Sequence, residues 1–156
     1  MASSLFKIQA DDGRFWSGDF SAAIDGTSIN TMKLLSSAAE RFQIITDESG
    51  WYQCIVIQPA CAYLQWQTTN GHTALTQSDI PAPDNGEVKG KVSAVPPAPT
   101  MITFRYWTND QPINGRKIIM LTSDGRYLSR IQGARGVNYI DSVDVVSKAC
   151  VFTLLS

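Results

Sequence analysis

The sequence predicts an all-β fold assembled from three copies of one four-stranded unit. Three aromatic residues, Phe15, Tyr63 and Tyr127, align as the anchors of these copies. An apolar residue stands seven positions before each anchor, and another stands nine positions before it. Apolar residues two positions apart lie on the same face of a strand, as a half-buried strand requires. The pattern therefore predicts a strand ahead of each anchor, at three equivalent places.

Turn signals separate these strands from the anchors. Asp12-Gly13 and Asp124-Gly125 each stand before an arginine and an aromatic residue, and the middle copy has Pro59 in "QPAC" instead. Glycine adopts a positive φ at little cost, and aspartate accepts nearby backbone N–H groups. We interpret the repeated Asp-Gly-Arg as a structural turn, in preference to a ligand-facing set, because a recurring fold would need it at symmetric places.

A second shared block closes each copy. Its three forms are "AERFQII" (39–45), "APTMITF" (98–104) and "ACVFTLL" (149–155). The spacing from anchor to the aligned Phe42, Met101 and Phe152 is 27, 38 and 25 residues, so the middle copy is the longest. The excess falls in the Pro- and Gly-rich stretch 78–99, which predicts a long surface loop. The chain 1–156 is then one domain, with repeats at about 1–50, 51–114 and 115–156.

The stretch 29–43 is the strongest competitor for a helix. Met32, Leu35 and Ala39 match a helical period only loosely, and the flanking patterns are β-like. We expect a strand at 31–35, a short turn of helical type at 36–40, and then a further strand.

Three four-stranded units of this kind resemble the β-trefoil superfamily. The wording "SDGRYLSR" is most similar to the fascin-like branch, and the chain length is similar to that of small fungal and bacterial trefoil lectins. The resemblance implies three pseudo-symmetric repeats, with six strands closing a barrel and three hairpins capping one end. A single unit cannot bury its apolar face, whereas three together enclose one core. The resemblance also implies roles that are mostly not enzymatic.

Composition excludes several partners. The net charge is −1 and 17% of the residues are charged, so no excess of Lys and Arg indicates nucleic acid, although a local patch at Arg126, Arg130 and Arg135 stays open. No apolar run is long enough for membrane insertion. The first residues lack the basic and apolar regions of a signal peptide. We therefore expect a cytoplasmic protein, or one released by a leaderless route.

The cysteines indicate a reducing environment. Three cysteines without a signal peptide favour free thiols. A bridge between Cys54 and Cys61 across a hairpin remains the alternative.

No catalytic site is predicted. The single histidine, His72, has Ser78 and Asp79 nearby, but no nucleophile elbow accompanies them. No metal-ligand spacing and no nucleotide-binding motif is present. We therefore expect no catalytic residues, no metal and no cofactor, and the protein is not predicted to be an enzyme.

The candidate binding residues follow the anchors, where the three copies diverge. Shared spacing with unshared chemistry marks a surface that the fold does not dictate. An aromatic ring can stack on the apolar face of a sugar, while amide, carboxylate and guanidinium groups bond its hydroxyls. We interpret Trp16, Trp51 and Trp107 as packing residues and leave Trp66 open between packing and binding. The candidate ligand-binding residues are Trp66, Gln67, Asn70, His72, Asp19, Arg130, Asn138 and Tyr139.

The leading functional hypothesis is a non-catalytic lectin that recognises glycans or glycoproteins through shallow loop sites outside the barrel. Single sites of this kind have dissociation constants of about 0.1–1 mM, so useful avidity needs several sites or a homodimer. One alternative is a trefoil-type protease inhibitor acting through the 78–99 loop. The other is a fascin-like protein-binding module.

Overall fold

The computed structural model describes residues 5–47, 53–58, 62–81, 91–92, 102–105, 114–122 and 124–156, and these are almost entirely β structure. The strands of the first part are β1 (Lys7–Gln9), β2 (Phe15–Trp16), β3 (Ala22–Ala23), β4 (Asn30–Thr31), β5 (Lys33–Leu35), β6 (Arg41–Asp47), β7 (Gln53–Gln58), β8 (Ala62–Thr69) and β9 (His72–Pro81). The later ones are β10 (Lys91–Val92), β11 (Ile102–Arg105), β12 (Arg116–Thr122), β13 (Tyr127–Gln132), β14 (Asn138–Val143) and β15 (Phe152–Leu155). Two 3₁₀ turns, η2 (Ala134–Gly136) and η3 (Val146–Lys148), complete the described elements. The all-β prediction is confirmed.

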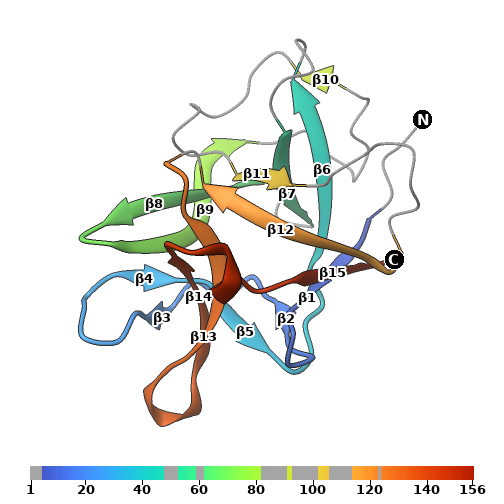
Figure 1. The fold of residues 1–156 in the computed structure, drawn as a ribbon. Coiled ribbons are helices and arrows are strands. Elements are labelled where there is room, and N and C mark those ends of the chain that lie inside the picture. Colours follow the sequence, from blue (N-terminus) through green and yellow to red (C-terminus); the bar gives the residue numbers. More distant parts are fainter. Residues whose placement is uncertain are drawn as a thin grey trace.

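A closed ring of seven strands forms the centre of the fold (Figure 1). Its order is β12-β13-β14-β5-β2-β1-β15, and β15 returns to pair with β12. The ring thus joins the two ends of the chain, since β1 pairs with β15. The resemblance implies a barrel of six strands, whereas the observed ring has seven and includes a direct pairing of β5 with β14. Among the described residues, no helix could span a membrane.

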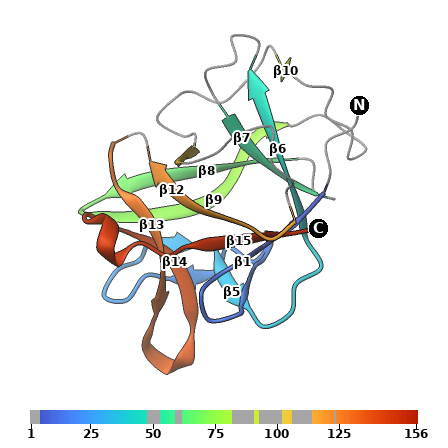
Figure 2. The ribbon, with the colours of Figure 1, turned by 45° about the vertical axis from the view of Figure 1, so that its right-hand side comes forward.

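A second sheet of five strands contains most of the middle copy. Its order is β10-β6-β7-β8-β9. A bridge between Phe6 and Phe42 connects this sheet to the ring, with reciprocal backbone hydrogen bonds of 3.0 and 2.8 Å. Figure 2 shows the long β8–β9 hairpin extending from this sheet beside the strands of the ring. A short β3–β4 hairpin forms a third, separate pair.

The three anchors occupy equivalent positions in the pairing. Each one pairs with the strand that precedes it: Phe15 with Gln9, Tyr63 with Val56 and Tyr127 with Leu121. A hairpin partner then follows each anchor strand, in β5, β9 and β14. The predicted strand before each anchor is therefore confirmed in all three copies.

The two Asp-Gly turns share one hydrogen-bond pattern. In the first, Ala10 N donates to Arg14 O at 2.7 Å and Gly13 N to Ala10 O at 3.1 Å. In the second, Thr122 N donates to Arg126 O at 2.9 Å and Gly125 N to Thr122 O at 3.0 Å. Both glycines have a positive φ, of 89° and 86°, which non-glycine residues rarely adopt. Backbone hydrogen bonds and a glycine with positive φ thus form both turns, as the structural interpretation of Asp-Gly-Arg predicts.

The stretch 29–43 contains no helix. Strands β4 and β5 lie in its first half, a bend follows at residues 36–37, and β6 begins at Arg41. The predicted strands are confirmed, whereas the helical turn expected at 36–40 is wrong. The backbone at Met32, between β4 and β5, bonds to strands β9 and β14.

Met32 lies at a junction of three strands, one from each copy. Met32 N donates to Leu75 O at 2.9 Å, and Ile140 N donates to Met32 O at 3.1 Å. The Thr31 hydroxyl bridges the same two strands, because it accepts from Leu75 N at 2.9 Å and donates to Ile140 O at 2.8 Å. We call these four residues the three-strand junction. It holds the hairpins of all three copies together at the centre of the fold.

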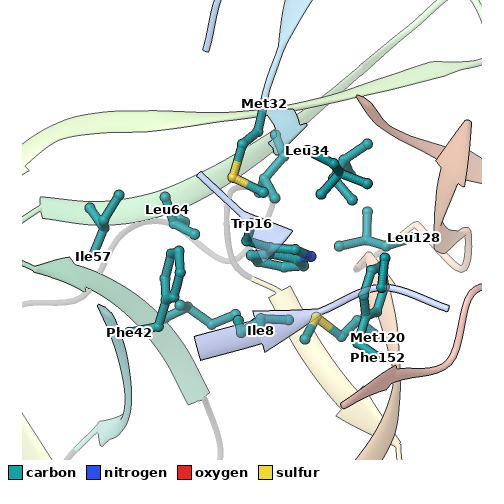
Figure 3. Packing of buried hydrophobic residues seen from close by; sticks show 14 of the residues in the cluster. Ile8, Trp16, Met32, Leu34, Phe42, Ile57, Leu64, Met120, Leu128 and Phe152 are labelled. Carbon is teal, nitrogen blue, oxygen red and sulfur yellow. The ribbon is translucent and has the colours of Figure 1, made fainter. Parts of the chain in front are cut away.

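Trp16 stands at the centre of the hydrophobic core (Figure 3). Its side chain is 0% exposed. Its ring meets Phe42 at 5.8 Å and Phe152 at 5.4 Å between centroids, both edge to face. The two residues that align with it, Leu64 and Leu128, belong to the same cluster. The packing role expected for Trp16 is confirmed.

Several predictions concern residues outside the described part of the chain. They are the roles of Trp51 and Trp107, the pairing of Cys54 with Cys61, the turn at Pro59, and most of the 78–99 loop. These remain predictions.

The third cysteine, Cys150, is a buried free thiol. Burial raises its pKa to about 12. A cysteine in an unfolded chain has a pKa of about 8.5, so the unfolded state loses the thiol proton at a lower pH than the native state does. The contribution of Cys150 to the free energy of unfolding therefore falls as the pH rises from about 8.5 towards 12.

We expect iodoacetamide at pH 8 to leave Cys150 unmodified in the native protein and to alkylate it in urea, because only the exposed thiolate reacts. Peptide mass spectrometry resolves this site from the other two cysteines. Native alkylation of the Cys150 peptide at the rate seen in urea would contradict its burial.

Candidate functional site

The structure places seven of the eight predicted binding residues in two separate regions, and it places Trp66 in the hydrophobic core. One region is the tip of the β8–β9 hairpin. The other lies where the β3–β4 loop meets the β13–β14 turn, at the lower left of Figure 1.

Trp66 does not belong to a binding surface. It is 4% exposed and is part of the hydrophobic core cluster. Its neighbour Gln67 points the other way and is exposed, because side chains alternate along β8. The open question about Trp66 is thus resolved towards packing, and a buried ring cannot stack on a sugar.

The hairpin tip is an Asn-Gly turn. Asn70 and Gly71 have φ angles of 51° and 79°, as a two-residue turn with both central residues left-handed requires. Asn70 is exposed, and its backbone conformation gives it a structural role. Gln67 and Asn70 are accessible there, and neither of them lines the two hollows described below.

His72, the next residue, pairs with a carboxylate from another copy. Its Nδ1 lies 2.9 Å from Asp141 Oδ2, and the carboxylate is only 8% exposed. Asp141 Oδ1 also accepts from Thr73 N and Ser142 N, both at 2.7 Å. Asp141 is not among the predicted binding residues, because it stands 69 residues away from His72 in the sequence.

A serine beside this pair does not complete a catalytic triad. The Ser142 hydroxyl lies 2.7 Å from Thr73 Oγ1 and accepts from Arg126 Nε at 2.6 Å. These bonds hold β9 against β14. In the part of the chain that is described, no three His, Cys, Asp or Glu side chains are grouped to hold a metal ion.

The second region contains the other four predicted residues. Arg130 Nε donates to Asp11 Oδ1 at 2.7 Å, and a second guanidinium nitrogen donates to Asn138 Oδ1 at 3.2 Å. The hydrogen bond to Asp11 raises the pKa of Arg130. The structure therefore brings Arg130 and Asn138 together, although Asn138 itself is buried.

Tyr139 forms the apolar base of this region. Its ring is buried in a small cluster with Ala22 and Ile24, and burial raises its pKa. Its phenol oxygen accepts a hydrogen bond from Asp25 N at 3.2 Å. Tyr139 thus positions the β3–β4 loop and does not face solvent.

Asp25 is the residue in this region that sequence reasoning missed. Its carboxylate Oδ2 accepts from Ala134 N at 2.9 Å, across 109 residues of sequence. The approach is close: a Cβ on Gly133 would lie 2.7 Å from the Tyr139 ring and 3.2 Å from Asp25 Oδ1. In the sequence Asp25-Gly26 resembles any other turn, so no local signal identifies this contact.

Two adjoining hollows open between these loops. The larger has a volume of about 380 Å³ and lies between the β3–β4 hairpin and η2, with Asp25, Lys33 and Arg135 among its lining. The smaller, of about 270 Å³, lies beside it and includes Arg14 and Asn138. Lys33 and Val137 line both. We call the two together the loop hollow.

Asp19 reaches the loop hollow through Lys33. Its Oδ2 lies 3.6 Å from Lys33 Nζ. Its other oxygen accepts hydrogen bonds from the Ser21 hydroxyl and backbone N–H, and these bonds hold the pKa of Asp19 below its usual range. Of the eight predicted residues, Asp19, Arg130, Asn138 and Tyr139 therefore line or support one surface.

These observations define a class of protein by fold: an all-β protein built around a closed ring of strands, with an open hollow between its loops. No family model and no curated protein matches the sequence. A solved structure from Caenorhabditis elegans, of a protein with unknown function, is similar, with a TM-score of 0.61 and 10% identity. The match covers 99% of this chain and 94% of that chain. At this identity the likeness concerns the fold alone.

Proposed function

We propose that the chain is a β-trefoil of lectin-like or fascin-like type, and that it binds glycans in the loop hollow without a covalent step. The trefoil assignment is supported by the equivalent pairing of the three anchors and by the shared bonds of the two Asp-Gly turns. The three-strand junction adds a contact to which every copy contributes.

The glycan assignment is supported mainly by the lining of the loop hollow. Charged groups of both signs surround an apolar floor that includes Ala22, Ile24 and Val137. Sugar hydroxyls both donate and accept, so Asp25 and the basic side chains offer complementary partners.

Trp66 is absent from this mechanism, because its ring is in the core. Recognition then depends on hydrogen bonds to hydroxyls, with van der Waals contact on the apolar floor. The positions of the polar groups are held by contacts far apart in sequence, such as Asp25 with Ala134 and Arg130 with Asn138. A rigid site lowers the entropy lost on binding.

A glycan array with competition by free sugar tests this proposal. We expect Ala23→Trp to reduce binding at least roughly tenfold, because Ala23 is an exposed residue of the hollow and the new ring would fill it. Val146→Trp is the matched control, since Val146 is 49% exposed and does not line the hollow. Equal binding by the two variants would move the site elsewhere.

The same protein samples distinguish the glycan proposal from an alternative site, from a protease inhibitor and from a fascin-like module. Loss of glycan binding in Asn70→Ala, with Ala23→Trp unaffected, would place the site at the β8–β9 tip. Inhibition in a protease panel would favour the inhibitor hypothesis, for which the 78–99 loop lies largely outside the described residues. Co-sedimentation with filaments would favour the fascin-like module.

A further inference from the structure

The charge around the loop hollow differs from that of the whole chain. The protein carries a net charge of −1, yet Arg14, Lys33 and Arg135 line the two hollows and Asp25 is the single carboxylate among their lining residues. The Asp25 carboxylate already accepts the Ala134 N–H. The surface offered to a ligand is therefore mainly one of cationic donors.

The three cations differ in how far they are already engaged. Arg14 forms an ion pair with Asp12, and Lys33 lies 3.6 Å from Asp19. Arg135 has no hydrogen bond or ion pair within the described part of the chain. It is exposed on the rim of the larger hollow and offers a complete guanidinium, which binds carboxylates and sulfates in a two-pronged manner.

The backbone of Arg135 gives a second, independent observation. Its φ is 61° and its ψ is 21°, a left-handed conformation that disfavours residues with a Cβ. Gly136 follows with a φ of 74°, and glycine would suit position 135 equally well. An arginine at a strained position, where glycine fits, is what a functional demand on its side chain produces.

We infer that the loop hollow takes an anionic group, and that Arg135 together with Lys33 binds it. The inference rests on the proposed function, because the anion is taken to be part of a glycan. A carboxylate of an acidic sugar and a sulfate ester share the required chemistry: each presents two or more oxygens to cationic N–H donors. The Arg126 and Arg130 side chains do not add to this site, since Ser142 and Asp11 accept from them.

Isothermal titration with matched glycans tests the inference. One pair is a glycoprotein with its sialic acids present or removed, and the other is a glycosaminoglycan with its sulfates present or removed. We expect the wild-type protein to bind the charged member of at least one pair tenfold or more tightly, and the pair that responds identifies the anion. The preference should weaken at high salt.

Arg135→Gly separates a binding role from a structural one. It should lose the preference for the charged glycan, while its melting temperature equals or exceeds that of the wild type, because the strain is relieved. Lys33→Gln should reduce the preference as well. Lys117→Gln is the matched control: it removes one exposed positive charge from β12, outside the hollow, and should leave the preference unchanged.

Different outcomes contradict the glycan proposal and the anion inference. If the wild-type protein binds neutral and charged members equally and Ala23→Trp abolishes both, the anionic inference is wrong and the glycan proposal stands. If no glycan binds at all, the proposed function is wrong. If Arg135→Gly retains the full preference for the charged member, Arg135 is not the recognising residue.

Discussion

Replacing Trp16 with alanine is expected to lower the free energy of unfolding by about 3–5 kcal/mol, the range seen for large aromatic side chains removed from cores. Trp16 is fully buried and its ring meets Phe42 and Phe152 edge to face. Its loss leaves a cavity at the point where the copies meet, so few neighbours can move to fill it. Urea unfolding followed by far-UV circular dichroism measures the change.

Two further variants at this position make the result specific. Trp16→Leu places there the residue that the other two copies carry, and should recover part of the loss. Trp16→Phe should cost least, since the indole Nε1 has no hydrogen-bond partner among the described residues. If the free energy of unfolding of Trp16→Ala lies within about 1 kcal/mol of the wild-type value, the core does not depend on this ring.

Replacing Thr31 with valine is expected to cost about 2–6 kcal/mol, although the two side chains have nearly the same shape. The Thr31 hydroxyl is fully buried and bonds Leu75 N and Ile140 O. Valine leaves both backbone groups buried without a partner, and each such group costs roughly 1–3 kcal/mol. Urea unfolding is again the measurement.

Thr31→Ser is the control, because it keeps the hydroxyl and removes one methyl group. It should cost about 1 kcal/mol, in line with one buried methyl. If the serine and valine variants are equally unstable, packing rather than the hydroxyl holds the three-strand junction together.

The strands before the three anchors were predictable because strand patterning is local. The alternation before Phe15, Tyr63 and Tyr127 needs only neighbouring residues to be recognised, and the structure pairs each of these anchors with the strand that precedes it. The helical turn expected at 36–40 was wrong for the complementary reason. Residues 36–40 instead form a bend and an extended connection that carries the chain from β5 to β6 of another sheet, and the local pattern does not contain that destination.

The candidate site was predicted less well, because a side chain's exposure depends on which elements cover it. Trp66 stands beside polar residues in the sequence, yet the pleat of β8 directs its ring into the core and Gln67 into solvent. Arg130 and Asn138 could both be named as candidates because they stand in one short stretch of sequence, on the two strands of one hairpin. Asp25 was not found, because its partner Ala134 comes from the other end of the chain.

By itself the sequence determined the β class, the three anchors and the Asp-Gly turns, all of which arise from side-chain alternation and local backbone preference. The tertiary structure alone decided which loops meet, and so placed Asp25, Lys33 and Arg135 around one hollow. Contacts between residues more than a hundred positions apart depend on how the copies pack against each other. That packing is set by burial of the shared core, which no single stretch of the chain contains.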